Sequence, residues 1–211
     1  MDNNLSPDDL DHSQYDRIDG LINGGDIAYL PVEYRLEIIG MRQSRFGELS
    51  DDDVNFTIDC IRSDTIRVAM RAAVLLATCN DDVLKMLPPI FPTIPHSKVR
   101  RALLLIMGAP SSIWALDFLL IVLRDTNDEH EVNTIIEALS RTEQHVFTVI
   151  FFTLGTADPR FKYRLQLALR YKGFEYARPF LEALPYIPDI AFFQETYGAD
   201  ALDEIIRGGQ R

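Results

Sequence analysis

Four similar segments decide the fold of this chain: DTIRVAMRAAVLLA from Asp64, HSKVRRALLLIMGA from His96, DEHEVNTIIEALSR from Asp128 and DPRFKYRLQLALRYKG from Asp158. Their first residues lie 32, 32 and 30 positions apart along the 211-residue chain. A constant spacing of this length is typical of repeat proteins. Within the segments apolar residues recur at spacings of three and four, which places them on one face of an α-helix. We therefore expect each segment to form an amphipathic helix.

The buried face of each predicted helix is a ladder of apolar residues. Its rungs are Ile66, Met70 and Ala73 in the first segment; Val99, Leu103 and Ile106 in the second; Ile135 and Ala138 in the third, where Glu131 takes the first place; and Phe161, Leu165 and Ala168 in the fourth.

Shorter apolar stretches lie between the four segments, and they too have helical character. They cover residues 81–91, 111–124, 143–154 and 174–184. Each repeat of about 31 residues then holds two antiparallel helices. Because neither helix can bury its apolar face alone, successive pairs must stack. The sequence therefore predicts an all-α protein, a right-handed α-solenoid of about four to five stacked antiparallel helix pairs.

The residues at the start of each segment resemble a known family. Asp64 is followed by Ile66-Arg67, and Asp158 by Phe161-Lys162; His96 with Val99-Arg100 follows the pattern without the Asp, and Asp128 with Glu131 departs from it in charge. This pattern resembles the HEAT-repeat family over residues 50–185. The resemblance implies that the turn Asp and the basic residue of each repeat, here Arg67, Arg100 and Lys162, form caps and salt links between repeats.

The remaining residues complete a single expected domain of residues 1–211. Residues 1–49 do not fit the repeat and form an acidic N-terminal helical cap, and residues 186–211 form a C-terminal cap with a mobile tail. Terminal repeats of such arrays are atypical because one of their faces meets water.

Local signals mark where the helices begin and end. Leu30-Pro31, Ser50 with Asp53, and Asp158-Pro159 are typical of helix starts, since they supply a cap or a proline at the first turn. Expected helix ends carry Gly at positions 40, 47, 108, 155 and 173. The apolar run Val146 to Leu154 could be a strand, but its neighbours are helical in period, and we interpret it as a buried helix.

The charge of the chain is unevenly distributed. The net charge is −11; residues 1–65 hold 15 acidic residues and five arginines, whereas residues 160–178 hold six basic residues and one acidic residue. A strongly acidic chain is repelled by nucleic acid and by anionic membranes. The asymmetry indicates either a surface for a protein partner with a basic surface or complementarity within the molecule.

No sequence signature of catalysis is present. The four His have no metal-ligand spacing, Asp51-x-Asp53-x-Asn55 lacks the Gly and Glu of a calcium loop, and no nucleotide-binding or nucleophile motif occurs. Cys60 and Cys79 lie in apolar surroundings and are interpreted as core residues. We expect no catalytic, cofactor-binding or metal-binding residue and no enzymatic activity. The acidic first residues lack a secretory signal, and no segment is long and apolar enough to cross a membrane, so we expect a cytoplasmic protein without a membrane partner.

Two surfaces are candidates for binding a partner. One is the acidic N-terminal face, and the other is the C-terminal segment in which tyrosines alternate with arginines, a composition enriched at protein interfaces. The alternative for the second is a core of Phe bordered by Tyr and Arg. The candidate residues are Asp51, Asp52, Asp53, Arg164, Arg170, Tyr171, Tyr176 and Arg178.

These features favour a non-catalytic protein-binding scaffold or adaptor. A specific form is an inhibitor or immunity-type protein that blocks a basic enzyme or toxin. The alternative is a nucleic-acid-acting module similar to HEAT-like DNA glycosylases, with a groove lined by Arg67, Arg71, Arg100 and Arg101. The net charge has the wrong sign for a duplex binder, and Trp114 is the only Trp. The sequence thus favours a protein partner over nucleic acid.

Overall fold

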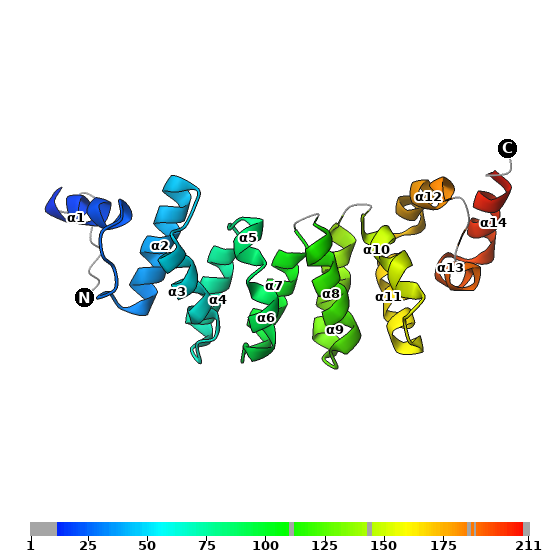
Figure 1. Cartoon of the computed structure of the whole chain (residues 1–211), viewed down its shortest axis with the longest axis horizontal. Coiled ribbons are helices and arrows are strands. Elements are labelled where there is room, and N and C mark those ends of the chain that lie inside the picture. Colours follow the sequence, from blue (N-terminus) through cyan, green and yellow to red (C-terminus); the bar gives the residue numbers. More distant parts are fainter. Residues whose placement is uncertain (1–11, 110–111, 143–144, 185–186, 188, 209–211) are drawn as a thin grey trace, which may run out of the picture. The chain divides into compact units, whose positions relative to one another are not determined.

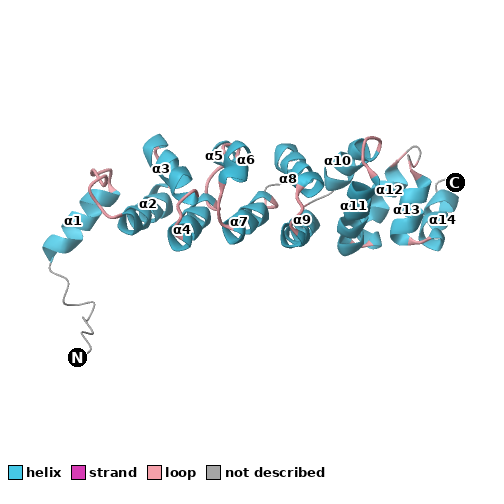
Figure 2. Ribbon diagram, turned by 90° about the horizontal axis from the view of Figure 1, so that it is seen from below, coloured by secondary structure: helices cyan, strands magenta, loops and turns pink. Residues whose placement is uncertain are grey.

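The computed structural model describes residues 12–109, 112–142, 145–184, 187 and 189–208. Within these ranges the chain consists of helices and loops, and no residue lies in a strand (Figures 1 and 2). The prediction of an all-α protein is confirmed. Residues 1–11 and 209–211, which belong to the expected N-terminal cap and C-terminal tail, lie outside the described residues.

The helices succeed one another with short connections. They are α1 (His12–Ile22), α2 (Val32–Phe46), α3 (Asp51–Ile61), α4 (Ile66–Leu76), α5 (Asp81–Leu84), α6 (Leu87–Ile90), the 3-10 turn η2 (Phe91–Thr93), α7 (Ser97–Met107), α8 (Ile113–Asp125), α9 (Glu129–Arg141), α10 (His145–Leu154), α11 (Pro159–Lys172), α12 (Phe174–Ala183), α13 (Ile190–Tyr197) and α14 (Ala199–Gly208).

The chain divides into two compact units, and the first comprises residues 1–87 and 93–99. In this unit α1 packs on α2, and both α2 and α3 pack on α4 (Figure 1). Its best-defined apolar cluster is formed by Ile27, Ile38 and Ile39. Partly buried side chains from α1, α3 and α4 pack around that cluster. Burial of this apolar surface holds the helices of the first unit together.

The predicted starts of α2 and α3 are confirmed. Pro31 immediately precedes α2, and the Ser50 hydroxyl accepts a hydrogen bond of 3.2 Å from the backbone N–H of Asp53 at the start of α3. Gly47 ends α2 with a φ of 78°, a conformation that favours glycine. Gly40 does not end a helix, contrary to our expectation. It lies inside α2, where a Cβ would come within 3.1 Å of the Leu75 side chain, so glycine allows α2 and α4 to approach closely.

The apolar ladder of the first repeat is shifted from its predicted register. The predicted rung Ala73 is buried, but Ile66 is 42% exposed and Met70 is only partly buried. Val68, Ala72 and Leu76 are buried instead and continue the ladder. These three residues precede the buried Val99, Leu103 and Met107 of α7 by a constant 31 positions. The predicted ladder paired Ile66 with Val99, 33 positions apart, and so placed its first rungs two residues too early. Asp64, taken as the start of the segment, precedes its helix without capping it.

The predicted helix over residues 81–91 is broken in the structure. It is replaced by the short helices α5 and α6 and by the turn η2. Pro88, Pro89 and Pro92 lack the N–H that helix hydrogen bonds require, and each restricts the residue before it. The apolar side chains Leu84, Leu87 and Phe91 are nevertheless buried, so the stretch packs as expected although it is not one helix.

The second unit comprises residues 88–92 and 100–211. Helix α8 packs on α9, α10 and α11, and α11 also packs on α9, α12 and α13. Helix α14 closes this unit against α12 and α13. The run Val146 to Leu154 lies in α10, as predicted, and Phe147, Ile150 and Leu154 are buried. Gly108 lies directly after α7, where the chain comes very close to α9. A Cβ at this position would lie 2.7 Å from the Cβ of Ala138, so only glycine fits there.

Polar links join successive helices of the second unit. Arg100 donates to Glu131 at 2.6 Å, and Lys162 forms an ion pair of 3.2 Å with Asp189, which caps α13. The caps predicted at Asp128 and Asp158 are present at the starts of α9 and α11. Arg100 and Lys162 thus each link their helix to a later element of the chain. Arg67, in the first unit, forms no ion pair with any described residue.

Candidate functional site

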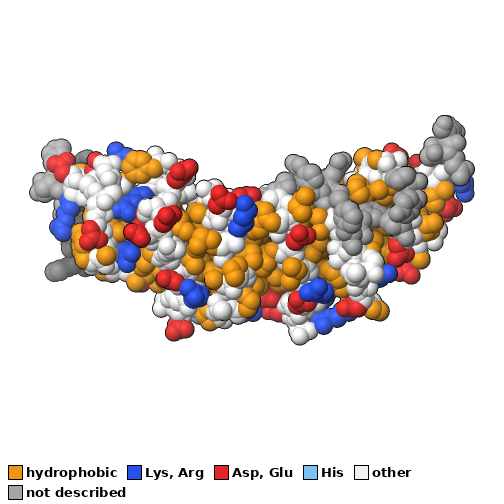
Figure 3. All heavy atoms as spheres, viewed as in Figure 1, with side chains coloured by type: hydrophobic (Ala, Val, Ile, Leu, Met, Phe, Trp, Pro, Cys, Tyr) orange, Lys and Arg blue, Asp and Glu red, His pale blue; other side chains and the backbone are white. Residues whose placement is uncertain are grey.

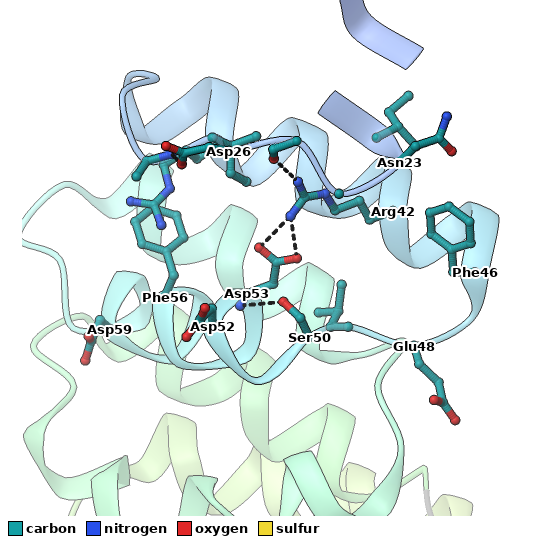
Figure 4. Close-up of a pocket in the computed structure, with 17 residues that line it drawn as sticks. Asn23, Asp26, Arg42, Phe46, Glu48, Ser50, Asp52, Asp53, Phe56 and Asp59 are labelled. Carbon is teal, nitrogen blue, oxygen red and sulfur yellow. Dashed lines mark hydrogen bonds and ion pairs between the residues drawn. The ribbon is translucent and has the colours of Figure 1, made fainter. Parts of the chain in front are cut away.

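A hollow of about 790 Å³ opens among the end of α1, the loop that follows it, α2 and the start of α3 (Figure 4). We call it the acidic hollow. It lies within the first unit. Its lining residues are Ile22, Asn23, Gly24, Gly25, Asp26, Ile27, Ala28, Arg35, Arg42, Phe46, Glu48, Leu49, Ser50, Asp52, Asp53, Phe56 and Asp59.

Arg42 ties together the three elements that form the hollow. Its guanidinium donates to both carboxylate oxygens of Asp53, at 2.8 and 3.1 Å, and to the backbone carbonyls of Leu21 and Gly25, at 2.8 and 2.6 Å. The Asp53 side chain is only 6% exposed and that of Arg42 only 13%. Each of the three guanidinium nitrogens is engaged, including Nε, which donates to the Leu21 carbonyl at 3.1 Å. Arg42 is therefore part of the wall and has no donor left for an anionic ligand.

The second guanidinium of the hollow also faces inward. Arg35 lies 3.5 Å from the centroid of the Phe56 ring, a cation–π contact that joins α2 to α3. Its Nε atom is buried and has no hydrogen-bond partner in the described structure. Stacking on Phe56 thus occupies one face of this guanidinium.

Carboxylates outnumber these two cations around the hollow. They belong to Asp26, Glu48, Asp52, Asp53 and Asp59. Asp26 accepts a hydrogen bond from the Ala28 N–H at 2.8 Å, and Asp59 forms an ion pair with Arg62 at 2.5 Å.

The two remaining carboxylates, those of Glu48 and Asp52, have no hydrogen-bond or ion-pair partner among the residues that the structure describes. In Figure 4 the Glu48 side chain extends away from Asp53 and Arg42. The rings of Phe46 and Phe56 already lie beside the guanidiniums of Arg45 and Arg35, so a cation that enters the hollow would be attracted mainly by its excess of negative charge.

The three predicted site residues of α3 differ in their exposure to solvent. Asp51 and Asp52 are exposed in the first turn, where carboxylates also stabilise the helix N-terminus. Asp53 is buried and bound to Arg42. It is therefore not a surface residue, in contrast to our expectation, because the helical period turns the third position of the helix toward α2.

Arg164 is also buried, again in contrast to our expectation. It is 4% exposed and donates to the backbone carbonyls of Leu123 and Thr126 at the end of α8, the first at 2.5 Å and the second at 3.0 Å. These carbonyls have no partner within their own helix, and Arg164 satisfies them. Desolvation lowers the pKa of Arg164 from its ordinary value.

The other basic residues of the C-terminal segment are largely engaged within the second unit. Arg170 donates to the carbonyls of Glu195 and Thr196, and Arg178 lies 3.4 Å from Glu204 and 3.3 Å from Glu175. Complementarity within the molecule, the alternative to a partner surface, therefore accounts for much of this charge.

The two candidate tyrosines differ in their surroundings. Tyr171 is 67% exposed. Tyr176 is 41% exposed and stacks on the buried Phe147 with a centroid distance of 6.2 Å. This arrangement matches the expected border of amphipathic residues around a Phe core. A role for either tyrosine in binding stays a prediction.

Lys172 is a structural cation that the sequence did not single out. Its ammonium group donates to the carbonyls of Ser140 and Thr142 at the end of α9 and lies 4.0 Å from the centroid of the Tyr176 ring. Burial lowers the pKa of Lys172 to about 8. The sequence shows only that Lys172 lies in the last turn of a helix, α11. That position does not predict its contacts with the end of α9.

The cysteines are isolated thiols. Cys60 is buried, as predicted, and burial raises its pKa to about 11. Cys79 is half-buried, and its pKa is also raised by burial. Across the described ranges, no group of three or more His, Cys, Asp or Glu side chains is arranged to hold a metal ion. No described helix combines the length and apolar character needed to span a membrane.

The sequence predicted the acidity of this region but did not reveal the hollow itself. Arg42, which holds its walls together, lies in a part of α2 without any motif, and its partner Asp53 was assigned to the surface. Comparison with known proteins adds no relative: a scan against family models, a search of curated proteins and a search of solved structures each found no match to this chain.

Proposed function

We propose that the chain is a non-catalytic HEAT-like α-solenoid that binds a protein partner with a basic surface. In this proposal the acidic hollow receives a Lys or Arg side chain of the partner. The observation that carries the proposal is the charge of the hollow: five carboxylates and two guanidiniums line it, and one of the guanidiniums, that of Arg42, is already paired with Asp53. A partner cation can therefore gain attraction without first displacing an internal ion pair of Asp52 or Glu48.

The solenoid part of the proposal rests on the repeated helices. The buried positions of α4 and α7 recur at 31 residues, and α7, α9 and α11 carry the predicted segments. Arg100 and Lys162 link their helices to the next element, as salt links between repeats would. Solenoids of this kind present an extended binding surface to another protein, and both an adaptor and an inhibitor would use such a surface.

The test compares retained partners at two salt concentrations. The tagged full-length chain is used to capture proteins from the cells of its source at about 50 mM and about 500 mM salt, because screening weakens steering between exposed charges. The test variant combines Glu48→Gln with Asp52→Asn. The control combines Asp117→Asn with Asp200→Asn, which removes the same charge from exposed positions in the second unit.

The proposal predicts one stoichiometric protein with a basic surface. That protein should be retained at low salt by the wild type and the control, released at high salt, and lost from the hollow variant. Equal retention by the hollow variant would contradict the role of the hollow. Retention of nucleic acid instead of a protein would favour the nucleic-acid-acting alternative, whose salt dependence is steep as well.

A further inference from the structure

A second, apolar concavity lies in the first unit between α2 and α4. It encloses about 460 Å³. Leu36 of α2 and Met70 and Leu75 of α4 line it with apolar atoms, and Val74, which is 62% exposed, stands at its mouth. Gly40 belongs to the same lining, and a Cβ there would come within 3.1 Å of the Leu75 side chain. We call this feature the α2–α4 groove.

Two arginines flank the groove. Arg67 and Arg71 lie four residues apart on α4, on the same face as Val74. Neither guanidinium forms a hydrogen bond or ion pair with a residue that the structure describes. From the α2 side only Glu37 faces them among the lining residues, and it too forms no ion pair with a described residue. The groove therefore combines an apolar floor with an excess of one positive charge.

The groove and the acidic hollow use opposite faces of α2. Arg35 and Arg42, seven residues apart, point to the hollow, whereas Glu37 and Gly40 point to the groove. At 100° per residue the two sets lie roughly opposite each other around the helix. Occupation of one site thus leaves the other accessible.

We propose that the α2–α4 groove binds a segment of a partner protein through an apolar side chain, with a carboxylate of that segment paired to Arg67 and Arg71. The charge of the rim selects this occupant: two guanidiniums without a carboxylate partner are complementary to an acidic, apolar peptide. Nucleic acid fits less well, because its phosphates would face an apolar floor and the Glu37 carboxylate. The inference is independent of the acidic hollow, which takes a basic side chain.

The test selects random peptides displayed on phage against the immobilised full-length chain. Enriched peptides are synthesised with a fluorophore, and their affinities are measured by anisotropy. The groove variants are Val74→Arg and the double variant Arg67→Glu with Arg71→Glu. Their controls are Ile121→Arg, at a 51% exposed position on α8, and Arg17→Glu, at an exposed position on α1. The thermal unfolding and circular dichroism of every variant are compared with those of the wild type.

The expected peptides carry an apolar residue close to Asp or Glu. Their affinity should fall about tenfold or more in both groove variants, as for a central interface contact, and stay unchanged in both controls. Failure to enrich any peptide, enrichment of basic peptides, or equal affinity for Val74→Arg would overturn the proposal. A labelled 20-nucleotide single strand is titrated in parallel. If it binds the wild type and loses affinity only when the arginines are replaced, the groove is a nucleic-acid site and the peptide proposal is wrong.

Discussion

Removal of Arg42 should destabilise the first unit far more than removal of a neighbouring surface arginine. In Arg42→Met, the Asp53 carboxylate would stay buried without the one cationic partner that it has among the described residues, and two backbone carbonyls would lose a donor. Loss of one member of a buried ion pair costs about 3–5 kcal/mol. In a chain of this size that corresponds to a fall in Tm of about 10 °C.

Arg45 provides the matched control, because it lies on the same helix. It pairs with Asp19, but the two side chains are 47% and 56% exposed. Exposed pairs contribute about 0–1 kcal/mol, so Arg45→Met should change Tm by no more than a few degrees. Thermal and urea unfolding followed by circular dichroism measure both variants.

A double-mutant cycle of Arg42→Met with Asp53→Asn isolates the pair itself. We expect a coupling free energy of about 1–3 kcal/mol, since the two side chains are in direct contact. A loss in Arg42→Met of less than about 1 kcal/mol, equal to that in Arg45→Met, would refute the reasoning that this pair holds α2 and α3 together.

Three further changes test other parts of the structure. Gly108→Ala should cost about 1–3 kcal/mol because its Cβ would collide with Ala138, whereas Gly155→Ala, with open space around the new Cβ, should be nearly neutral in urea unfolding. Because the pKa of Cys60 is raised to about 11, Ellman's reagent at about pH 8 should label this thiol in the Cys79→Ser variant only after the chain unfolds, and rapid labelling of the folded variant would contradict its burial. The folded-state pKa of Lys172 is lowered from 10.5 to about 8, so the unfolded chain binds more protons between these values, and the Tm of the wild type should rise relative to that of Lys172→Met as pH increases through this window.

Helix positions and many helix ends could be predicted from the sequence, because they depend on local chemistry. The Ser50 cap, the proline before α2, the Asp158 cap and the terminal Gly47 follow from the residues alone. The run Val146 to Leu154 is helical, as its neighbours indicated.

Register and breaks were harder to predict. The first two rungs of the first repeat were predicted two residues too early, at Ile66 and Met70 instead of Val68 and Ala72, and Asp64, the expected turn residue, does not cap its helix. Three prolines split the predicted helix of residues 81–91, and they outweighed its apolar content. Gly40 was predicted to lie near a helix end but lies inside α2. It packs closely against Leu75 of α4, and a contact between two helices cannot be recognised from the local sequence.

The candidate site depends on contacts between helices, and these explain what the sequence missed. The net charge of the N-terminal third is a property of composition and was therefore predictable. The pairing of Asp53 with Arg42, and of Arg164 with the carbonyls at the end of α8, requires knowledge of which helix lies opposite. Asp53 and Arg164 were both predicted to lie on the surface, because most charged residues are exposed.

The central claim is that the acidic hollow accepts a basic side chain, and nuclear magnetic resonance tests it most directly. The ¹⁵N-labelled chain is titrated with acetyl-Gly-Arg-Gly-amide, and with the Gln-containing analogue as a neutral control. The account predicts shifts that concentrate on Phe46, Asp52 and Phe56 for the arginine peptide alone, and that disappear when Glu48→Gln and Asp52→Asn are combined. Shifts spread evenly over the acidic residues of the chain, or unchanged in that variant, would contradict it.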